Sequence, residues 1–322
     1  MGNPKLHNPE WRVMDTPAMI LNYGDLNTTL PYLEDVSDDA LDKRYIDIIN
    51  NVDYLVCDLR DVPPVEAHFV SSWWWLKVKF HTEREYSRRN RALPTIASLP
   101  PAPGLKIPYA LSRPNESKFI VKYGEASWLE PMLKDGIIRI NPASKYRGEV
   151  AETDTARHDD ELKMHKYNSG RGARLTVLRT GQSAPINGNI QHTIGGPNYY
   201  VFCCSNEFDY RLFHAFKNDK GQSADSCLVI WDVDEFAKRL DDAVLKKLSG
   251  WHYYWGLVAY YDPYNVACNQ PISPGVCKDF KYAYQREYRF VWHPLSYPGA
   301  KEFFDVNIGS LEDIAELHHY PH

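Results

Sequence analysis

Residues 281–292, Lys-Tyr-Ala-Tyr-Gln-Arg-Glu-Tyr-Arg-Phe-Val-Trp, decide the fold that we expect for this chain. Successive side chains of a β-strand point to opposite faces, so the alternation of this stretch predicts a strand with two dissimilar faces. One face is an aromatic stripe, interrupted by Arg286, and consists of Tyr282, Tyr284, Tyr288, Phe290 and Trp292. The other face is polar and carries Lys281, Gln285, Glu287 and Arg289.

The segments before this strand alternate between strand and helix patterns without a regular βαβ rhythm. Strands are predicted over residues 118–123, 137–140, 175–179, 199–205, 226–231 and 251–261. Helices are predicted over 126–136, closed by Gly136, and over 233–248. This mixture predicts an α+β protein with a split, largely antiparallel sheet.

A proline-rich stretch over residues 93–108 divides the chain. We expect a partly helical N-terminal region (1–92), a linker (93–110) and a C-terminal domain (111–322). The N-terminal region should contain helices over 37–51 and 64–92, the second with a basic end that favours a solvated face over a nucleic-acid contact. The consecutive residues Trp73, Trp74 and Trp75 cannot all face one core, which makes this region a candidate docking surface for an antitoxin or chaperone protein.

The composition predicts a soluble, cytoplasmic protein. The 322 residues are 43% hydrophobic and 13% aromatic, and the net charge of -5 gives no general attraction to nucleic acid or anionic membranes. The N-terminus has no signal-peptide pattern, and no window is long and apolar enough to cross a bilayer. The six cysteines form no Cys-x-x-Cys pair, which favours reduced, buried thiols.

The polar face around Glu287 is the strongest candidate for chemistry. A glutamate flanked by a glutamine and an arginine can accept a hydrogen bond from a ribose hydroxyl while its charge stabilises a cationic sugar centre. The same pattern is typical of a solvated face with cross-strand ion pairs, and taken alone it favours that structural role.

Gln285-x-Glu287 on a late strand resembles the Gln-x-Glu motif of ADP-ribosyltransferases. The order of segments around it, over roughly residues 115–295, resembles an uncharacterised bacterial domain family associated with phage defence and toxin–antitoxin systems. These segments are Lys122-Tyr123-Gly124, Leu133-x-x-Gly136, Asn141 to Tyr146, Arg157 to Glu161, Val201 to Ser205 and Lys281 to Arg289.

The resemblance implies a transferase that uses NAD as its substrate, with no metal. Glu287 would then bind the nicotinamide ribose, and Gln285 would engage the acceptor. The remaining implied NAD-binding residues are Lys122, Tyr123, Arg139, Tyr146, Arg157, Ser205 and Arg289. The first strand departs from the family pattern, because Lys118 and Lys122 stand where an arginine or histidine is expected, and a lysine cannot form the bidentate arginine fork.

Several other interpretations remain open. The acceptor could be RNA, DNA or protein, with nucleic acid slightly favoured, and a basic patch at Arg171, Arg174 and Arg179 fits either nucleic acid or a solvated strand edge. The protein could instead be an NAD glycohydrolase or another nucleotide hydrolase, or a non-catalytic sensor. A metal site at Arg157 to Glu161 and a nucleophile at Cys203 or Cys204 are less favoured.

Overall fold

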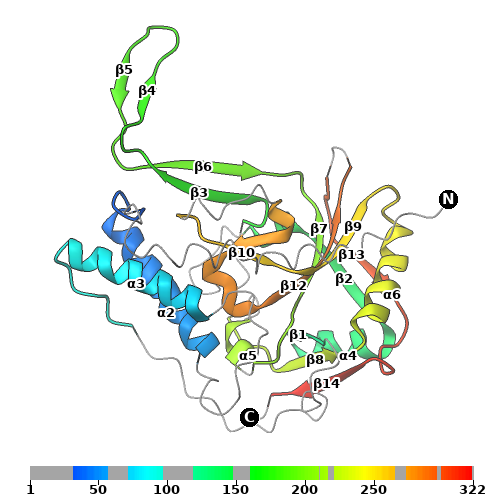
Figure 1. The fold of residues 1–322 in the computed structure, drawn as a ribbon. Helices are drawn as coiled ribbons and strands as arrows, with labels where there is room; N and C mark the ends of the chain where they lie inside the picture. The colour runs from blue at the N-terminus through cyan, green and yellow to red at the C-terminus, as the bar shows by residue number, and fades with distance from the viewer. Residues whose placement is uncertain are drawn as a thin grey trace. The chain divides into compact units, whose positions relative to one another are not determined.

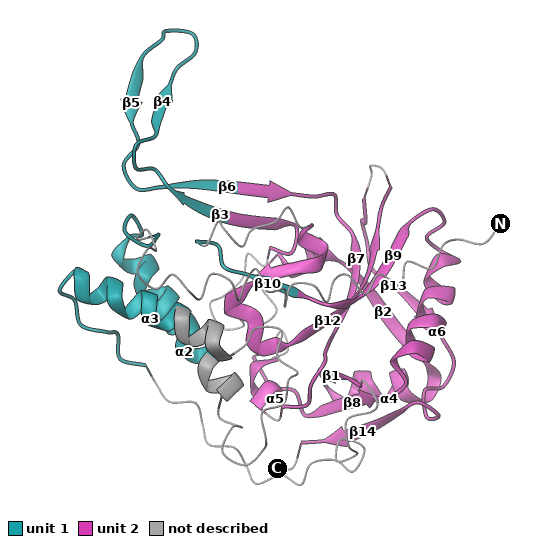
Figure 2. Ribbon diagram, in the orientation of Figure 1, with its two compact units in different colours: residues 1–96, 166–192, 259–270 teal, residues 97–165, 193–258, 271–322 magenta. Residues whose placement is uncertain are grey.

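The computed structural model describes residues 32–56, 72–96, 119–147, 160–209, 211–216, 221–264, 273–295 and 299–320. The chain forms two compact units (Figure 2). Unit 1 contains residues 1–96, 166–192 and 259–270, and unit 2 contains residues 97–165, 193–258 and 271–322. The predicted C-terminal domain thus contributes two segments to the unit of the N-terminal helices. The predicted linker lies mostly outside the described residues.

Unit 1 is built on two helices. Its elements are α2 (Asp38–Val56), α3 (Ser72–Arg88), β4 (Arg174–Thr176), β5 (Ser183–Pro185) and β10 (Ala259–Tyr261) (Figure 1). Strands β3 (Lys163–Ser169) and β6 (Asn189–Gly195) pair with each other, and each has residues in both units. Ser37 caps α2 by accepting the N–H of Ala40, at the start of the helix predicted over 37–51. The side chains of Trp73, Trp74 and Trp75, and with them the expected docking surface, lie outside the described residues.

The basic end of α3 is neutralised by nearby carboxylates. Arg88 and Arg89 both contact Glu85, and Arg89 also contacts Asp38 of α2. Arg91 pairs with Asp38 and Asp42. This end was predicted to be a solvated face; Arg88 is about half exposed, whereas Arg89 is only 15% exposed in its ion pairs.

Unit 2 is a mixed α+β unit built on one antiparallel sheet. Its elements are β1 (Ile120–Gly124), α4 (Ala126–Asp135), β2 (Ile137–Pro142), η5 (Ala143–Tyr146), β7 (Tyr200–Ser205), α5 (Arg211–Ala215), β8 (Ser226–Ile230), α6 (Val233–Leu245), β9 (His252–Leu257), η7 (Pro274–Val276), β11 (Cys277–Asp279), η8 (Phe280–Gln285), β12 (Glu287–His293), β13 (Phe304–Asn307) and β14 (Ala315–His319), where η marks a 3-10 helix. The predicted α+β class with a largely antiparallel sheet is confirmed. The two last strands, β13 and β14, were not predicted.

Strand β7 lies at the centre of the sheet. One of its edges pairs along its whole length with β12. Its other edge is shared, because β2 pairs with Tyr200 and Val201 at one end and β1 pairs with Ser205 at the other. The sheet is therefore split between β1 and β2. At the split, Nζ of Lys122 donates to the carbonyl oxygen of Cys203 at 2.6 Å.

The aromatic face of the sheet forms the main core. Tyr288, Phe290 and Trp292 of β12 pack there with Phe202 of β7. Helices α6 and α4 cover this face with Phe236, Leu240, Val244, Leu129 and Met132. Gly136 ends α4 at φ +67°, and a Cβ there would meet the carbonyl oxygen of Gly309, so only glycine fits.

The prediction of one continuous strand over 281–292 is wrong in its first half. Residues Phe280–Gln285 form the 3-10 helix η8, and the strand begins at Glu287. Asp279 caps η8 by accepting the N–H of Lys281 at 3.1 Å, which stabilises a helical turn in place of a strand. The alternating aromatic residues of 282–284 therefore lie in a helical turn and not in the sheet.

One core contact predicts a pH effect on stability. Asp241 on α6 accepts a hydrogen bond from Nε1 of Trp292, and burial raises the pKa of Asp241 to about 6. The folded state therefore binds a proton more readily than the unfolded state, so this group lowers stability as pH rises from about 4 to about 6. We expect the free energy of unfolding of Asp241→Asn to rise by about 1 kcal/mol relative to that of the wild type between pH 4 and pH 7. The effect is no larger because Asp241 is partly exposed.

Urea unfolding at pH 4 and pH 7 measures this difference. Glu130→Gln, in an exposed ion pair with Lys134 on α4, is the control and should not change the pH dependence. A parallel shift of the wild type and Asp241→Asn across this range would contradict the assignment.

Candidate functional site

The polar side chains of β12 and β7 meet on the face of the sheet opposite the aromatic core. Glu287 lies directly opposite Ser205, and Ser205 lies opposite Val121 of β1. Arg289 lies opposite Cys203 in the same register. Residues opposite one another on antiparallel strands share a face, so Glu287, Arg289, Cys203 and Ser205 form one polar row next to the split.

A left-handed residue joins η8 to β12. Arg286 has φ 46°, and its carbonyl oxygen accepts the N–H of Asn206. Its guanidinium pairs with Glu207 at 3.2 Å and with Asp209 at 3.4 Å. A non-glycine residue in this conformation costs on the order of 1 kcal/mol, and the ion pairs hold it there. Gln285 and Glu287 on either side of Arg286 both reach the same ammonium group.

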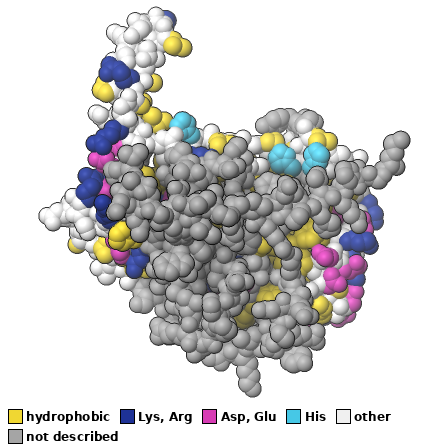
Figure 3. All heavy atoms as spheres, viewed as in Figure 1, with side chains coloured by type: hydrophobic (Ala, Val, Ile, Leu, Met, Phe, Trp, Pro, Cys, Tyr) yellow, Lys and Arg dark blue, Asp and Glu magenta, His cyan; other side chains and the backbone are white. Residues whose placement is uncertain are grey.

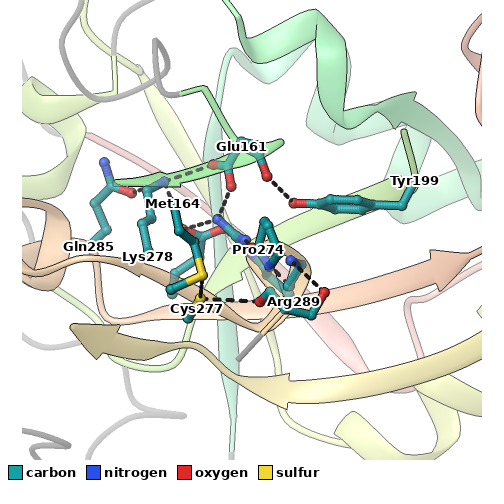
Figure 4. A network of polar contacts seen from close by, with 11 residues as sticks. Glu161, Met164, Tyr199, Pro274, Cys277, Lys278, Gln285 and Arg289 are labelled. Carbon is teal, nitrogen blue, oxygen red and sulfur yellow. Dashed lines mark hydrogen bonds and ion pairs between the residues drawn. The ribbon is translucent and has the colours of Figure 1, made fainter. Parts of the chain in front are cut away.

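That ammonium belongs to Lys278 on β11 (Figure 4). Its Nζ lies 3.0 Å from Oε1 of Glu161, 3.0 Å from Oε2 of Glu287 and 3.1 Å from Oε1 of Gln285. The ring of Tyr282 lies 4.7 Å from the same nitrogen. Lys278 thus links the two residues of the Gln-x-Glu motif to Glu161, which is far away in the sequence.

Arg289 is the second cation of the network. Its Nε donates to Oε1 of Glu287 at 2.6 Å, and its Nη2 donates to Oε2 of Glu287 and to Oε2 of Glu161. Nη1 donates to the carbonyl oxygens of Pro274 and Gly275. Tyr199 holds the backbone of Glu161 by donating its hydroxyl to the Glu161 carbonyl oxygen at 2.9 Å. We call Glu161, Lys278, Gln285, Glu287 and Arg289 the buried ion network.

The network balances two carboxylates against two cations inside the protein. Glu287 is 5% exposed and Arg289 is 2% exposed. Burial alone would raise the pKa of Glu287, but Arg289 and Lys278 lie so close that its pKa is held well below the usual range. The carboxylate is therefore ionised at neutral pH, as a group that stabilises a positive sugar centre must be.

Tyr146 of η5 packs in the same cluster as Cys203 of this row. Burial is the largest cause that raises the pKa of Tyr146, and the Cys203 thiol is the second. Glu161 and Glu287 raise the same pKa by smaller amounts. The Tyr146 hydroxyl accepts from Nδ2 of Asn141 at 3.4 Å. Ser205 is 2% exposed beside Glu287. Of the predicted site residues, the structure brings Gln285, Glu287, Arg289, Ser205 and Tyr146 together.

The other predicted residues contact different partners. Lys122 is on the opposite face of the sheet, with its Nζ 4.6 Å from the ring of Phe202. The ring of Tyr123 packs against Phe208, Phe213 and Phe216, and its hydroxyl bonds to the backbone of Asp209. Arg139 pairs with Asp305 in an exposed contact. Arg157 lies outside the described residues.

Sequence reasoning missed the roles of Glu161 and Lys278. Glu161 was noticed only as the last residue of the acidic run Arg157 to Glu161. Lys278 stands alone in Val-Cys-Lys-Asp, and no spacing links it to Glu287. Only the folded chain brings these two residues to the Gln-x-Glu motif.

Two alternatives were considered for this region, a cysteine nucleophile and a metal site. Burial raises the pKa of Cys204 to about 12 and that of Cys203 well above its ordinary value, so neither is a thiolate at neutral pH. No group of three His, Cys, Asp or Glu side chains is arranged as metal ligands within the described residues. His158 and Asp159 of the acidic run fall outside them.

No protein-family model, curated protein or solved structure matches this chain. In the described part of the chain, every helix is too short or too polar to cross a bilayer.

Proposed function

We propose that the protein is an ADP-ribosyltransferase that uses NAD as its substrate. The observation that carries this proposal is the position of Glu287: an ionised, buried carboxylate at the first residue of β12, opposite Ser205 of the central strand and next to the split of the sheet. The Gln-x-Glu resemblance implies that both residues bind NAD.

Glu287 and its neighbours would divide the chemistry between them. A ribose hydroxyl of NAD would replace one of the donors that now contact Glu287, and the carboxylate would stabilise positive charge on the ribose as the bond to nicotinamide breaks. Lys278 and Arg289 hold the carboxylate ionised and fix its position. Gln285, held by Lys278, would orient the acceptor that forms the new bond to the ribose.

The test is transfer of label from NAD that carries the label in its ADP-ribose part. The full chain is incubated with labelled NAD and with RNA, DNA or protein as acceptor. We expect a labelled macromolecule from the wild type, and a loss of at least about 100-fold in Glu287→Gln, since the removed charge acts on the transition state. Glu130→Gln, in the exposed pair on α4, should keep full activity.

A second variant separates chemistry from folding. Gln285→Ala keeps all four charges of the network, so it should still cleave NAD while losing transfer to the acceptor. If the wild type releases only free ADP-ribose, the protein is an NAD glycohydrolase. If it neither transfers label nor cleaves NAD, the proposal fails and the charge-balanced network has a structural role in a non-catalytic module.

Glu287→Gln also changes the stability of a buried network. The thermal midpoint of each variant is therefore compared with the wild type. The activity loss supports the proposal only where Glu287→Gln remains folded at the assay temperature.

A further inference from the structure

Residues 166–192 form a segment whose charge is opposite to that of the whole protein. They contain Lys166, Arg171, Arg174 and Arg179 and no aspartate or glutamate, whereas the chain has a net charge of -5. This segment therefore offers a polyanion a local attraction that the net charge of the whole chain does not.

Strands β4 and β5 of this segment form a ribbon that is exposed on both faces. Arg174 pairs with Pro185, Leu175 with Ala184 and Thr176 with Ser183, and all six residues are exposed. A two-stranded hairpin is marginally stable when it stands alone in water. Because its strands are exposed on both faces, this ribbon gains no stability from core packing. We call residues 174–185 the arm.

The tip of the arm is shaped by its own backbone. The carbonyl oxygen of Val177 accepts the N–H groups of Thr180 and Gly181, and the N–H of Val177 donates to Gln182. Gly181 takes a φ of +69°, which closes the turn. These bonds present Leu178, which is 97% exposed, at the end of the arm next to Val177.

The arm carries two arginines without an acidic partner in the described chain. Arg174 is held flat along the ribbon by hydrogen bonds to Oγ and the carbonyl oxygen of Ser183, at 3.0 and 3.1 Å. Arg179 is exposed beside Leu178. Arg171, nearer the base, differs because it pairs with Glu34. Positive and hydrophobic side chains alternate along this arm in the space-filling view (Figure 3).

We propose that the arm binds double-stranded nucleic acid, with Arg174 and Arg179 on phosphates and Leu178 as an apolar wedge at the bases. A two-stranded ribbon fits a groove of a duplex, and leucine is among the side chains that insert between base steps. The uncharged side chains of Thr180, Gln182 and Ser183 can donate to phosphate oxygens and base edges. The arm has no Trp or Tyr between Tyr167 and Tyr199, so it lacks the aromatic anchors of a membrane interface.

The inference does not depend on NAD chemistry, because binding is measured without NAD. A fluorescent 20-base-pair duplex, tested as DNA and as RNA, is titrated with the full chain at several salt concentrations. We expect Arg174→Gln with Arg179→Gln to weaken binding at least tenfold at 0.1 M salt. The slope of log K against log salt should become less steep by about 2, since each phosphate contact contributes about 0.9.

Two further variants make the test specific. Lys134→Gln with Lys238→Gln removes the same charge from exposed positions on α4 and α6 and should leave binding unchanged. Leu178→Ser should weaken binding without changing the salt slope, because it removes the wedge and no charge. The exposed arm tolerates all these changes, so the thermal midpoints should match the wild type.

The proposal is overturned if the wild type does not bind either duplex, or if the arm and control pairs of substitutions weaken binding equally. Phosphatidylserine vesicles are the comparison polyanion. Arm-dependent binding to vesicles with none to either duplex would assign the arm to a membrane surface and also overturn the proposal.

Discussion

Arg289→Met is expected to lower the free energy of unfolding by about 3–5 kcal/mol, because it leaves Glu161 and Glu287 buried with Lys278 as their only cation in the network. Methionine fills a similar volume, so little of this loss comes from a cavity. Two like charges then share one ammonium, and the pKa of Glu287 should rise toward or above its usual range. Urea unfolding at pH 7 measures the effect.

Arg139→Met provides the matched control on the same sheet. Arg139 pairs with Asp305 in an exposed contact, so its loss should change stability by no more than about 1 kcal/mol. Adding Glu287→Gln to Arg289→Met restores the balance of charge and should cost less than the sum of the two single substitutions. An Arg289→Met effect no larger than the control would contradict the coupling of the network.

Arg44→Met is expected to destabilise unit 1 by a similar amount, about 3–5 kcal/mol. Nη1 and Nη2 of Arg44 on α2 donate to the two carboxylate oxygens of Asp262, at 2.8 and 2.7 Å, and both side chains are almost fully buried. The guanidinium also lies over the rings of Tyr32 and Tyr264. Removing it leaves Asp262 buried without its cation, so hydrogen exchange of α2 should become faster.

Arg44→Lys tests the geometry of this pair, because lysine keeps the charge and loses the two-pronged fork. Its cost should lie between those of the wild type and Arg44→Met. Lys79→Met on α3, in a partly exposed pair with Glu83, is the control and should cost no more than about 0.5 kcal/mol. If hydrogen exchange of α2 is as slow in Arg44→Met as in the wild type, the Asp262 contact does not stabilise this helix.

Local patterns in the sequence were sufficient for helix α2 of unit 1 and for most of the helices and strands of unit 2. Ser37 and Gly136 marked helix ends by capping chemistry that acts within a few residues. The alternation of Tyr288, Phe290 and Trp292 with Glu287 and Arg289 gave the two faces of β12, because side-chain direction in a strand is fixed by the backbone itself. The local cap of η8 by Asp279 was overlooked.

The composition of the candidate site was decided by tertiary structure. Glu287 was visible in the sequence, but Glu161 and Lys278 come from distant segments, and no spacing predicts that they meet. Conversely, Lys122 was expected at the site and lies on the opposite face of the sheet, because it follows Val121, which lies opposite Ser205. Tyr123 was also expected there, and its ring packs among phenylalanines. The sequence by itself determined local conformation and which face is apolar, because both depend on near neighbours. Only the fold decided which charges are buried together, because that depends on strand pairing between segments far apart in the chain.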